Sequence, residues 1–278
     1  MSRLDRDPVG TRRKATTMAL HHESFGAGVP VLALHGWTPD HRLMTGCLEP
    51  VFADVPGYRR HYPDLPGMGQ TPAGDIDSSD GIMAELRTFI DEQIGAEPFL
   101  LIGESYGGYL ARGLIAERPE QVLGLALICP IGTALMHADR TVPEHVALRT
   151  EPGVLESLEE DEDFTEIAVV QTAAALHAYR SDIAPGLAAA DTAALDRIQK
   201  NSWALTIAPE SGPAYQRPTL IVCGRQDSVT GYEDQYALLP HYPRATYAVL
   251  DVAGHNLQLE QPELFGALIR EWLDRTAE

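Results

Sequence analysis

One short run in the sequence combines a possible nucleophile with the glycines that its geometry requires. Gly103-Glu104-Ser105-Tyr106-Gly107 has the pattern G-x-S-x-G and follows an apolar run that ends at Ile102. A serine in the sharp turn between a strand and a helix has strained backbone angles, and a Cβ atom on either side would clash. In return, its hydroxyl projects above the sheet, at the N-terminus of the helix. In this context the pattern predicts that Ser105 is a nucleophile rather than an incidental residue of a glycine-rich turn.

An acid and a histidine follow two later apolar runs. The run 219–223 leads into Gly224-Arg225-Gln226-Asp227, and the run 247–250 leads into a loop that contains Gly254-His255. A loop aspartate alone usually caps a turn, and a lone loop histidine is usually solvated. Both, however, lie just past a strand, in the crevice where parallel sheets bind ligands. The order Ser105, Asp227, His255 therefore indicates that His255 takes the proton of Ser105 and that Asp227 orients His255.

A third feature would stabilise negative charge on a reacting carbonyl. The apolar run 29–34 ends in His35-Gly36-Trp37, and a glycine here lets backbone N–H groups turn inward. We expect the donors of this oxyanion hole to be the backbone N–H groups of Trp37 and of Tyr106, the residue after the nucleophile. His35 is expected to hydrogen-bond the loop backbone and shape the hole rather than to act in catalysis.

These residues need a parallel sheet to position them, and the apolar pattern supplies one. Apolar runs typical of buried strands alternate with segments that carry one apolar helical face. The expected strands are 29–34, 99–102, 123–128, 219–223 and 247–250, and the expected helices are 81–95, 106–118 and 262–274. This alternation predicts an α/β fold with helices on both faces of the sheet.

One region interrupts the alternation. Residues 132–212 show no convincing strand and are expected to be helical throughout; they carry a net charge of −9, much of it in an acidic patch over 151–166. A helical block between two strands is typical of an inserted cap. The expected division is a disordered or loosely ordered tail at 1–16, a core at 17–131 and 213–278, and a cap at 132–212.

Composition limits the possible partners and locations. The chain has 278 residues, 44% hydrophobic and 22% charged, with a net charge of −19. This charge argues against nucleic acid and anionic membranes as partners. No apolar run approaches the roughly 20 residues of a membrane helix, and no secretory signal is evident. Because Cys47, Cys129 and Cys223 are far apart and show no metal-ligand spacing, a cytoplasmic location fits best.

The chain resembles a capped serine hydrolase of the α/β-hydrolase superfamily, in its esterase- and peptidase-like branch. The motifs that carry this resemblance are His35-Gly36, Asp64-Leu65-Pro66-Gly67-Met68-Gly69, the run 103–107, Gly224-Arg225-Gln226-Asp227 and Gly254-His255. The resemblance implies a mostly parallel eight-stranded sheet, opened by an antiparallel strand that residues 17–25 could supply. Asp64 is expected to have a structural role, bonding backbone in the turn that it begins.

Several residues of this sequence differ from those typical of other branches of the superfamily, and these differences exclude some reactions. Dehalogenases and epoxide hydrolases of this fold use aspartate where this chain has Ser105, and H-G-G-G esterases carry more glycine than His35-Gly36-Trp37-Thr38. Proline iminopeptidases usually have Trp after the serine, where this chain has Tyr106. We therefore expect hydrolysis of a small carboxylic ester through an acyl-enzyme, with no metal or organic cofactor and with a small acyl substrate as partner.

Several alternatives stay open at this point. They are an aminopeptidase of the proline-iminopeptidase type, a cofactor-free perhydrolase or C–C hydrolase, and a non-catalytic receptor for a small ligand. The cap would select the substrate. Its aromatic residues Tyr179 and Trp203, with Tyr215 beyond it, either line the pocket or pack the cap onto the core. The acidic patch would favour neutral or cationic substrates over anionic ones.

Overall fold

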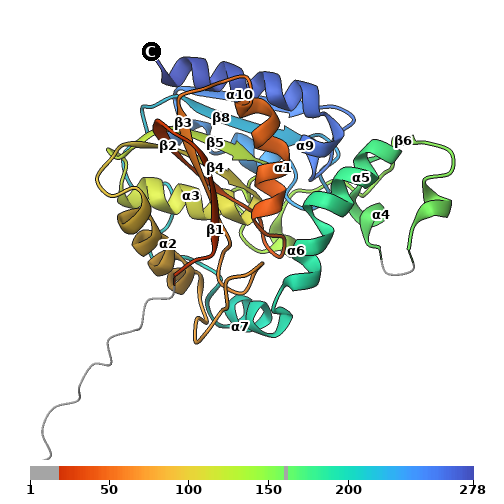
Figure 1. The fold of residues 1–278 in the computed structure, drawn as a ribbon, viewed down its shortest axis with the longest axis horizontal. Helices are drawn as coiled ribbons and strands as arrows, with labels where there is room; N and C mark the ends of the chain where they lie inside the picture. Colours follow the sequence, from red (N-terminus) through yellow and green to blue (C-terminus); the bar gives the residue numbers. More distant parts are fainter. Residues whose placement is uncertain (1–18, 160–161) are drawn as a thin grey trace, which may run out of the picture.

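The protein is built on one twisted, mostly parallel sheet (Figure 1). The computed structural model describes residues 19–159 and 162–278, so the expected tail at 1–16 lies outside the described residues. Within them, the strand order is β1-β3-β2-β4-β5-β8-β9. The strands are β1 (His22–Gly26), β2 (Val29–Leu34), β3 (Tyr58–Pro63), β4 (Phe99–Glu104), β5 (Val122–Ile128), β8 (Thr219–Gly224) and β9 (Ala245–Leu250).

The expected antiparallel opening strand is present, but the strand count differs. Strand β1 pairs antiparallel with β3, whereas the other neighbours in the sheet pair in parallel. The described residues give a sheet of seven strands rather than eight. Since the described range begins at residue 19, only residues 19–21 precede β1 within it, and β1 is its first strand.

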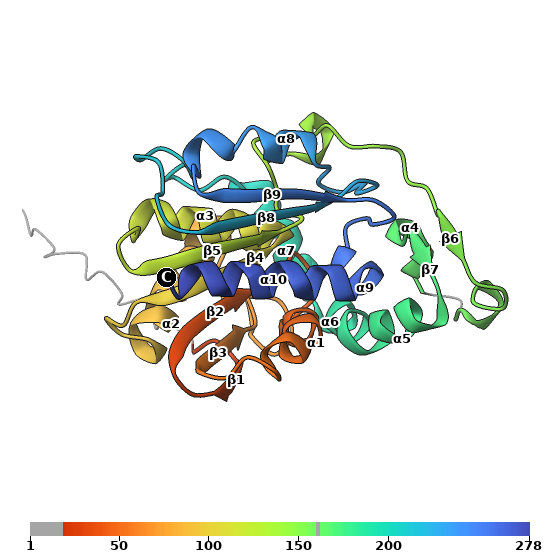
Figure 2. The same ribbon diagram turned by 90° about the horizontal axis from the view of Figure 1, so that it is seen from above.

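Helices cover both faces of the sheet (Figures 1 and 2). Alternate residues along β2 belong to different cores: Leu32 and Leu34 to one, Val31 and Ala33 to the other. The first core includes residues of α2 (Ser79–Gln93) and α3 (Ser105–Glu117), and the second includes residues of α1 (His41–Phe52) and α10 (Pro262–Thr276). Shorter helices α8 (Glu233–Tyr236) and α9 (Leu257–Glu260) follow β8 and β9. Among the described residues, no helix combines the length and apolarity needed to cross a bilayer.

The insertion between β5 and β8 is not helical throughout, which corrects the expectation from sequence. It contains a ladder of two parallel two-residue strands, β6 (Arg149–Thr150) and β7 (Val170–Gln171). Figure 2 shows this ladder beyond one end of the main sheet, near α4 and α5. Such short strands give no apolar alternation that a sequence pattern could reveal. The helices of the insertion are α4 (Phe164–Ile167), α5 (Ala173–Asp182), α6 (Ala184–Ala189) and α7 (Thr192–Ser202).

Arg112 on α3 ties the two ends of this insertion to the core. Its guanidinium donates to the carbonyls of Ile131 and Gly132, where the insertion begins, and to the carboxylate of Glu210, near where it ends. The Arg112 side chain is only 3% exposed. These contacts agree with a division between core and cap near 132 and 212, and that division stays a prediction.

We predict that Arg112→Met lowers the free energy of unfolding by about 3 kcal/mol, because it leaves the largely buried carboxylate of Glu210 without its charged partner, with only the Tyr242 hydroxyl still donating to it. The matched control is Arg118→Met, whose partner Asp91 is 61% exposed and whose loss should cost less than about 1 kcal/mol. Urea unfolding midpoints measure both changes. Equal midpoints for the two variants would contradict the role given to Arg112.

Candidate active site

Ser105 lies at the junction of β4 and α3, in the turn that its motif predicts. It is the first residue of α3 and has φ of 50°, in the left-handed region that non-glycine residues rarely adopt. A Cβ atom at position 103 would lie 2.5 Å from the carbonyl oxygen of Gly107, and one at position 107 would lie 2.4 Å from the carbonyl oxygen of Leu34, so each position needs glycine. The turn leaves the Ser105 residue 7% exposed.

The structure brings the three expected residues into one hydrogen-bonded chain. The Nε2 atom of His255 lies 3.0 Å from the Oγ atom of Ser105, and its Nδ1 atom lies 3.0 Å from Oδ2 of Asp227. Asp227 is fully buried. It also accepts hydrogen bonds from the backbone N–H groups of Val229 and Thr230 and from the Thr230 hydroxyl. These bonds fix the carboxylate that faces His255.

Charge and burial shift the pKa values of Asp227 and His255. Burial raises the pKa of Asp227, but the charge and hydrogen bond of His255 and the bonds from Thr230 outweigh it and hold that pKa below its ordinary value. Burial lowers the pKa of His255, yet the charge and hydrogen bond of Asp227, with the charge of Glu104, raise it to about 9. The arrangement therefore stabilises the imidazolium that forms when His255 takes a proton.

The residues expected to supply the oxyanion hole are neighbours. The rings of Trp37 and Tyr106 meet edge to face, 4.9 Å apart. Thr38 has φ of 84°, which turns the chain sharply just after Trp37. Tyr106 is the second residue of α3, and N–H groups in a first helical turn have no partner within the helix. The backbone N–H of Tyr106 can therefore act as a donor beside Ser105, and the donor from Trp37 stays a prediction.

Trp203 supports this aromatic pair from the insertion. Its ring stacks on Tyr106 at 4.5 Å and meets Trp37 edge to face at 4.6 Å. The Ser79 hydroxyl donates to the carbonyl of Trp203 and accepts from the hydroxyl of Tyr106. Trp203 thus packs the insertion against the core beside the loop that begins at His35, after β2, which we call the oxyanion loop.

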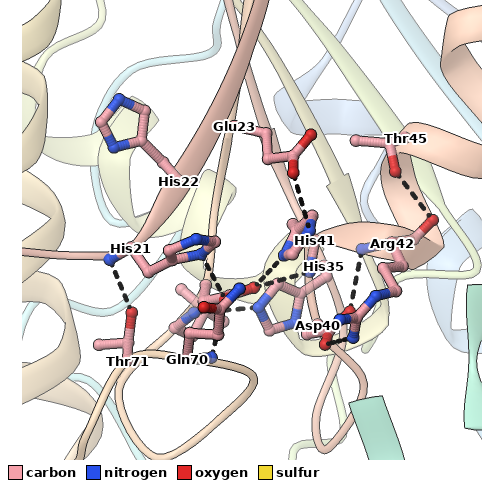
Figure 3. Close-up of polar contacts among 12 residues, drawn as sticks. His21, His22, Glu23, His35, Asp40, His41, Arg42, Thr45, Gln70 and Thr71 are labelled. Carbon is pink, nitrogen blue, oxygen red and sulfur yellow. Dashed lines mark hydrogen bonds and ion pairs between the residues drawn. The ribbon is translucent and has the colours of Figure 1, made fainter. Parts of the chain in front are cut away.

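A second polar junction, which includes His35 and His41, lies at the start of the oxyanion loop (Figure 3). His35 donates from Nδ1 to the carbonyl of Gly36 and accepts at Nε2 from the backbone N–H of Leu65. Burial lowers the pKa of His35, which favours this neutral form. Asp64 accepts from the backbone N–H groups of His41 and Gln70. His35 and Asp64 therefore bond loop backbone, as we expected.

A cavity of about 140 Å³ opens at Ser105 and His255. Tyr179 lines it, together with Leu43, Ile183 and Leu187, whereas Trp203 is not among its lining residues. Tyr215 is also elsewhere, with its hydroxyl donating to the carbonyl of Val122. Of the three aromatic residues singled out from the sequence, only Tyr179 therefore reaches the cavity.

A larger cavity, of about 450 Å³, lies between α1, α5 and α10. It is lined by Cys47 and Asp182 among mostly apolar residues. Burial raises the pKa of the Cys47 thiol, which disfavours the reactive thiolate. The smaller cavity is therefore the candidate active site, because it holds the nucleophile and the base.

Two groups among the described residues bring three possible metal-binding side chains within 4.8 Å of one another. In the first, the Nδ1 atoms of His21 and His41 lie 2.9 and 2.7 Å from the oxygens of Asp64, which also accept backbone N–H groups. The second group adds Cys129 to Asp227 and His255, which bond each other. Hydrogen bonds thus occupy these groups, and neither is assigned to a metal.

Two buried acids near His255 escaped sequence analysis. Glu104, the variable residue before Ser105, has Oε1 3.4 Å from Nε2 of His255. Glu260 accepts from the backbone N–H of Gly254, beside His255, and from that of Val169 next to β7. No general pattern marks either position. The one signal in the sequence is the charge of Glu104 within the otherwise uncharged run 103–108.

Comparison with known proteins decides the family. The family model described as alpha/beta hydrolase fold matches residues 29–262. The chain belongs to the α/β-hydrolase family. The expected family, fold class and hydrolase assignment are thereby confirmed.

Individual relatives cover nearly the whole chain. A pimeloyl-[acyl-carrier protein] methyl ester esterase of Shewanella woodyi is 26% identical over 265 residues, or 92% of this chain and 98% of the relative. A 2-hydroxymuconate semialdehyde hydrolase of Pseudomonas putida is 26% identical over 89% of this chain and 88% of the relative. The crystal structure of an alpha/beta superfamily hydrolase from Oenococcus oeni PSU-1 has 33% identity and a TM-score of 0.87, covering 94% of this chain and 97% of that one.

We predict that Gly103→Ala lowers the free energy of unfolding by about 1–3 kcal/mol, because the new Cβ would meet backbone atoms rather than a side chain that can move. Gly212→Ala is the matched control, since a Cβ there has no heavy atom within 4 Å. The measurement is the urea midpoint of each variant. A Gly103→Ala protein as stable as Gly212→Ala would show that the turn is not under the constraint described.

Proposed function

We propose that the protein is a serine hydrolase that cleaves a small carboxylic ester through an acyl-enzyme. Ser105 is the nucleophile, His255 the general base and Asp227 the acid that orients the histidine. The observation that carries this proposal is the hydrogen-bonded chain of the three side chains, with both links at 3.0 Å, at the floor of a cavity. Similarity to proteins named as esterases supports an ester as substrate.

The first half of the reaction forms the acyl-enzyme. Neutral His255 takes the proton of Ser105 as the hydroxyl oxygen attacks the ester carbonyl. The backbone N–H groups of Trp37 and Tyr106 donate to the resulting oxyanion; in another serine hydrolase, loss of one such donor costs about 3–4 kcal/mol. The imidazolium then gives its proton to the departing alkoxide.

The second half releases the acid. His255 takes a proton from water as the water oxygen attacks the acyl carbonyl, and the proton returns to Ser105 when the acyl bond breaks. The chain's own groups supply each proton transfer in this scheme.

We also propose that the protein is cytoplasmic, as its sequence suggests.

Cavity size and lining favour a short acyl group. The cavity of about 140 Å³ has apolar walls that include Leu43, Ile167, Ile183 and Leu187. An apolar protein cavity of about 150 Å³ holds a benzene molecule. The proposed acyl group is therefore about that size.

Hydrolysis of a C–C bond is the second candidate function. The relative from Pseudomonas putida that is named a 2-hydroxymuconate semialdehyde hydrolase matches 89% of this chain. The same nucleophile and base would then act on a vinylogous diketone instead of an ester. A substrate screen separates the two reactions.

We predict that a fluorophosphonate labels the protein at Ser105 and that Ser105→Ala abolishes both labelling and ester hydrolysis. The screen covers p-nitrophenyl esters of increasing chain length, aminoacyl naphthylamides and a vinylogous diketone, with the short esters expected to be turned over fastest. Ser211→Ala, at an exposed serine outside the cavity, is the folded control that keeps Ser105. Absence of labelling in the unaltered protein would overturn the mechanism, and diketone turnover without ester turnover would favour the second candidate.

Carboxylates also line the candidate site, and they bear on substrate charge. Asp163 and Glu166 from the insertion line the cavity with Glu104, and neither Lys nor Arg is among its lining residues. Glu160 and Asp161, two other acids of the patch, lie outside the described residues. The lining therefore supports a preference for neutral or cationic substrates over anionic ones.

We predict that a cationic ester has a kcat/KM at least about five-fold that of a matched anionic ester at low salt, since one charge at 4 Å in water contributes about 1 kcal/mol. Asp163→Asn with Glu166→Gln should reduce this ratio. Glu156→Gln, in the acidic patch but not among the lining residues, is the control. Equal turnover of both esters by the unaltered protein would remove the preference.

A further inference from the structure

Glu104 is a buried carboxylate inside the candidate active site that the proposed reaction does not use. It is the last residue of β4 and the N-cap of α3, directly before Ser105. Its side chain is 3% exposed, and it lines the same cavity as Ser105 and His255. A carboxylate in such a place costs free energy unless its environment compensates it, so its partners show what it does.

Two partners hold this carboxylate. Oε1 lies 3.4 Å from Nε2 of His255, and the backbone N–H of Gly36 donates to the carboxylate. A Cβ atom at position 36 would overlap Oε2 of Glu104. Glu104 thereby connects the oxyanion loop, which begins at His35, with the histidine on the opposite side of the site.

His255 is therefore flanked by acids on both ring nitrogens. Asp227 faces Nδ1 at 3.0 Å, while Ser105 and Glu104 both face Nε2, at 3.0 and 3.4 Å. The other groups near the ring are the Thr230 hydroxyl, 3.5 Å from Nδ1, the buried Cys129 thiol, within 4.8 Å of a ring nitrogen, and Arg140, whose charge opposes protonation of the histidine. Asp227 is already anchored by three bonds from Val229 and Thr230. Glu104 accepts fewer hydrogen bonds than Asp227 does, because besides His255 only Gly36 donates to it.

We propose that Glu104 is a positioning residue that accepts the Nε2–H of protonated His255, so that Ser105 and Glu104 compete for the same ring nitrogen. The proposal deepens the proposed function and rests on it for the role of Ser105. When His255 is neutral, its Nε2 lone pair faces the Ser105 hydroxyl. When it is protonated, Nε2–H has the Glu104 carboxylate within reach, and the imidazolium is held by both acids. No covalent bond to Glu104 forms or breaks.

Titration of the two groups agrees with this geometry. Burial raises the pKa of Glu104 to about 7, against the charge of His255, and the pKa of His255 is raised to about 9. Between these pH values both groups are charged and paired, and the base is not free to take a proton. Reactivity of Ser105 should therefore rise with pH through about 9. Removing the charge of Glu104 should shift that rise to lower pH.

The decisive experiment is an NMR titration of the His255 imidazole in the unaltered protein and in Glu104→Gln. Glutamine keeps the shape of the side chain and can still accept from Gly36, but it lacks the charge. The pKa of His255 should fall by about 1–3 units, the usual effect of losing an opposite charge at this separation. The control is Glu117→Gln at the other end of α3, which should leave the His255 titration unchanged. An unchanged or higher His255 pKa in Glu104→Gln would overturn the proposal.

A second readout separates positioning from a purely structural role. The rate of fluorophosphonate labelling of Ser105 against pH should show its acid limb shifted downward in Glu104→Gln, so that labelling at pH 7 becomes a larger fraction of the plateau. A plateau that falls at every pH without a shift of the limb would show that Glu104 only supports the fold. Glu104→Asp keeps the charge but holds it farther from His255, so it should give an intermediate shift. It is the variant to use if Glu104→Gln does not fold.

Failure of this proposal can be told apart from failure of the proposed function. The imidazole titration needs no substrate and no reactive serine. A protein that is never labelled but whose His255 titration shifts in Glu104→Gln would retain the pairing while losing the hydrolase mechanism. A labelled protein whose titration does not shift would retain the mechanism while losing the pairing.

Discussion

The left-handed backbone of Ser105 is the constraint on which the rest of the site depends. With φ of 50°, this residue lets strand β4 turn directly into helix α3. The turn is tight enough that a Cβ atom at Gly103 would meet the backbone of Gly107, and one at Gly107 would meet the backbone of Leu34 in β2. The strain is sustained because β4 is buried along its whole length and α3 packs on the sheet beside it. A flexible loop could not hold a hydroxyl in so defined a direction.

The remaining groups reach Ser105 because the carboxyl ends of parallel strands lie at one edge of the sheet. Strands β5 and β8 separate β4 from β9, so the loop after β9 must extend across them to bring His255 to the serine. Asp227, in the turn after β8, bonds His255. Glu260 secures the same loop by accepting from the backbone next to His255. The insertion joins this framework through Trp203, whose ring stacks beside the oxyanion loop.

The sequence predicts the groups that a strict geometric motif requires, but not those that packing alone decides. Ser105, Asp227 and His255 were found because each directly follows a strand in a fixed order, and the structure brings them within hydrogen-bonding distance. Glu104 was treated as a variable position, since its closeness to His255 depends on a loop from the far end of the chain. The ladder of β6 and β7 was missed because two residues carry no periodicity. Trp203 and Tyr179 could not be distinguished, because a pattern shows that an aromatic residue is buried but not which surface it meets.

The central claim is that catalysis passes through a covalent acyl group on Ser105. The most direct measurement is rapid mixing of the protein with a short p-nitrophenyl ester, followed by acid quenching, intact mass measurement and peptide mapping. The account predicts a burst of one p-nitrophenol per chain and a mass increase equal to one acyl group, carried by the peptide that contains Ser105. Hydrolysis with no burst and no adduct, or an adduct on another residue, would contradict it.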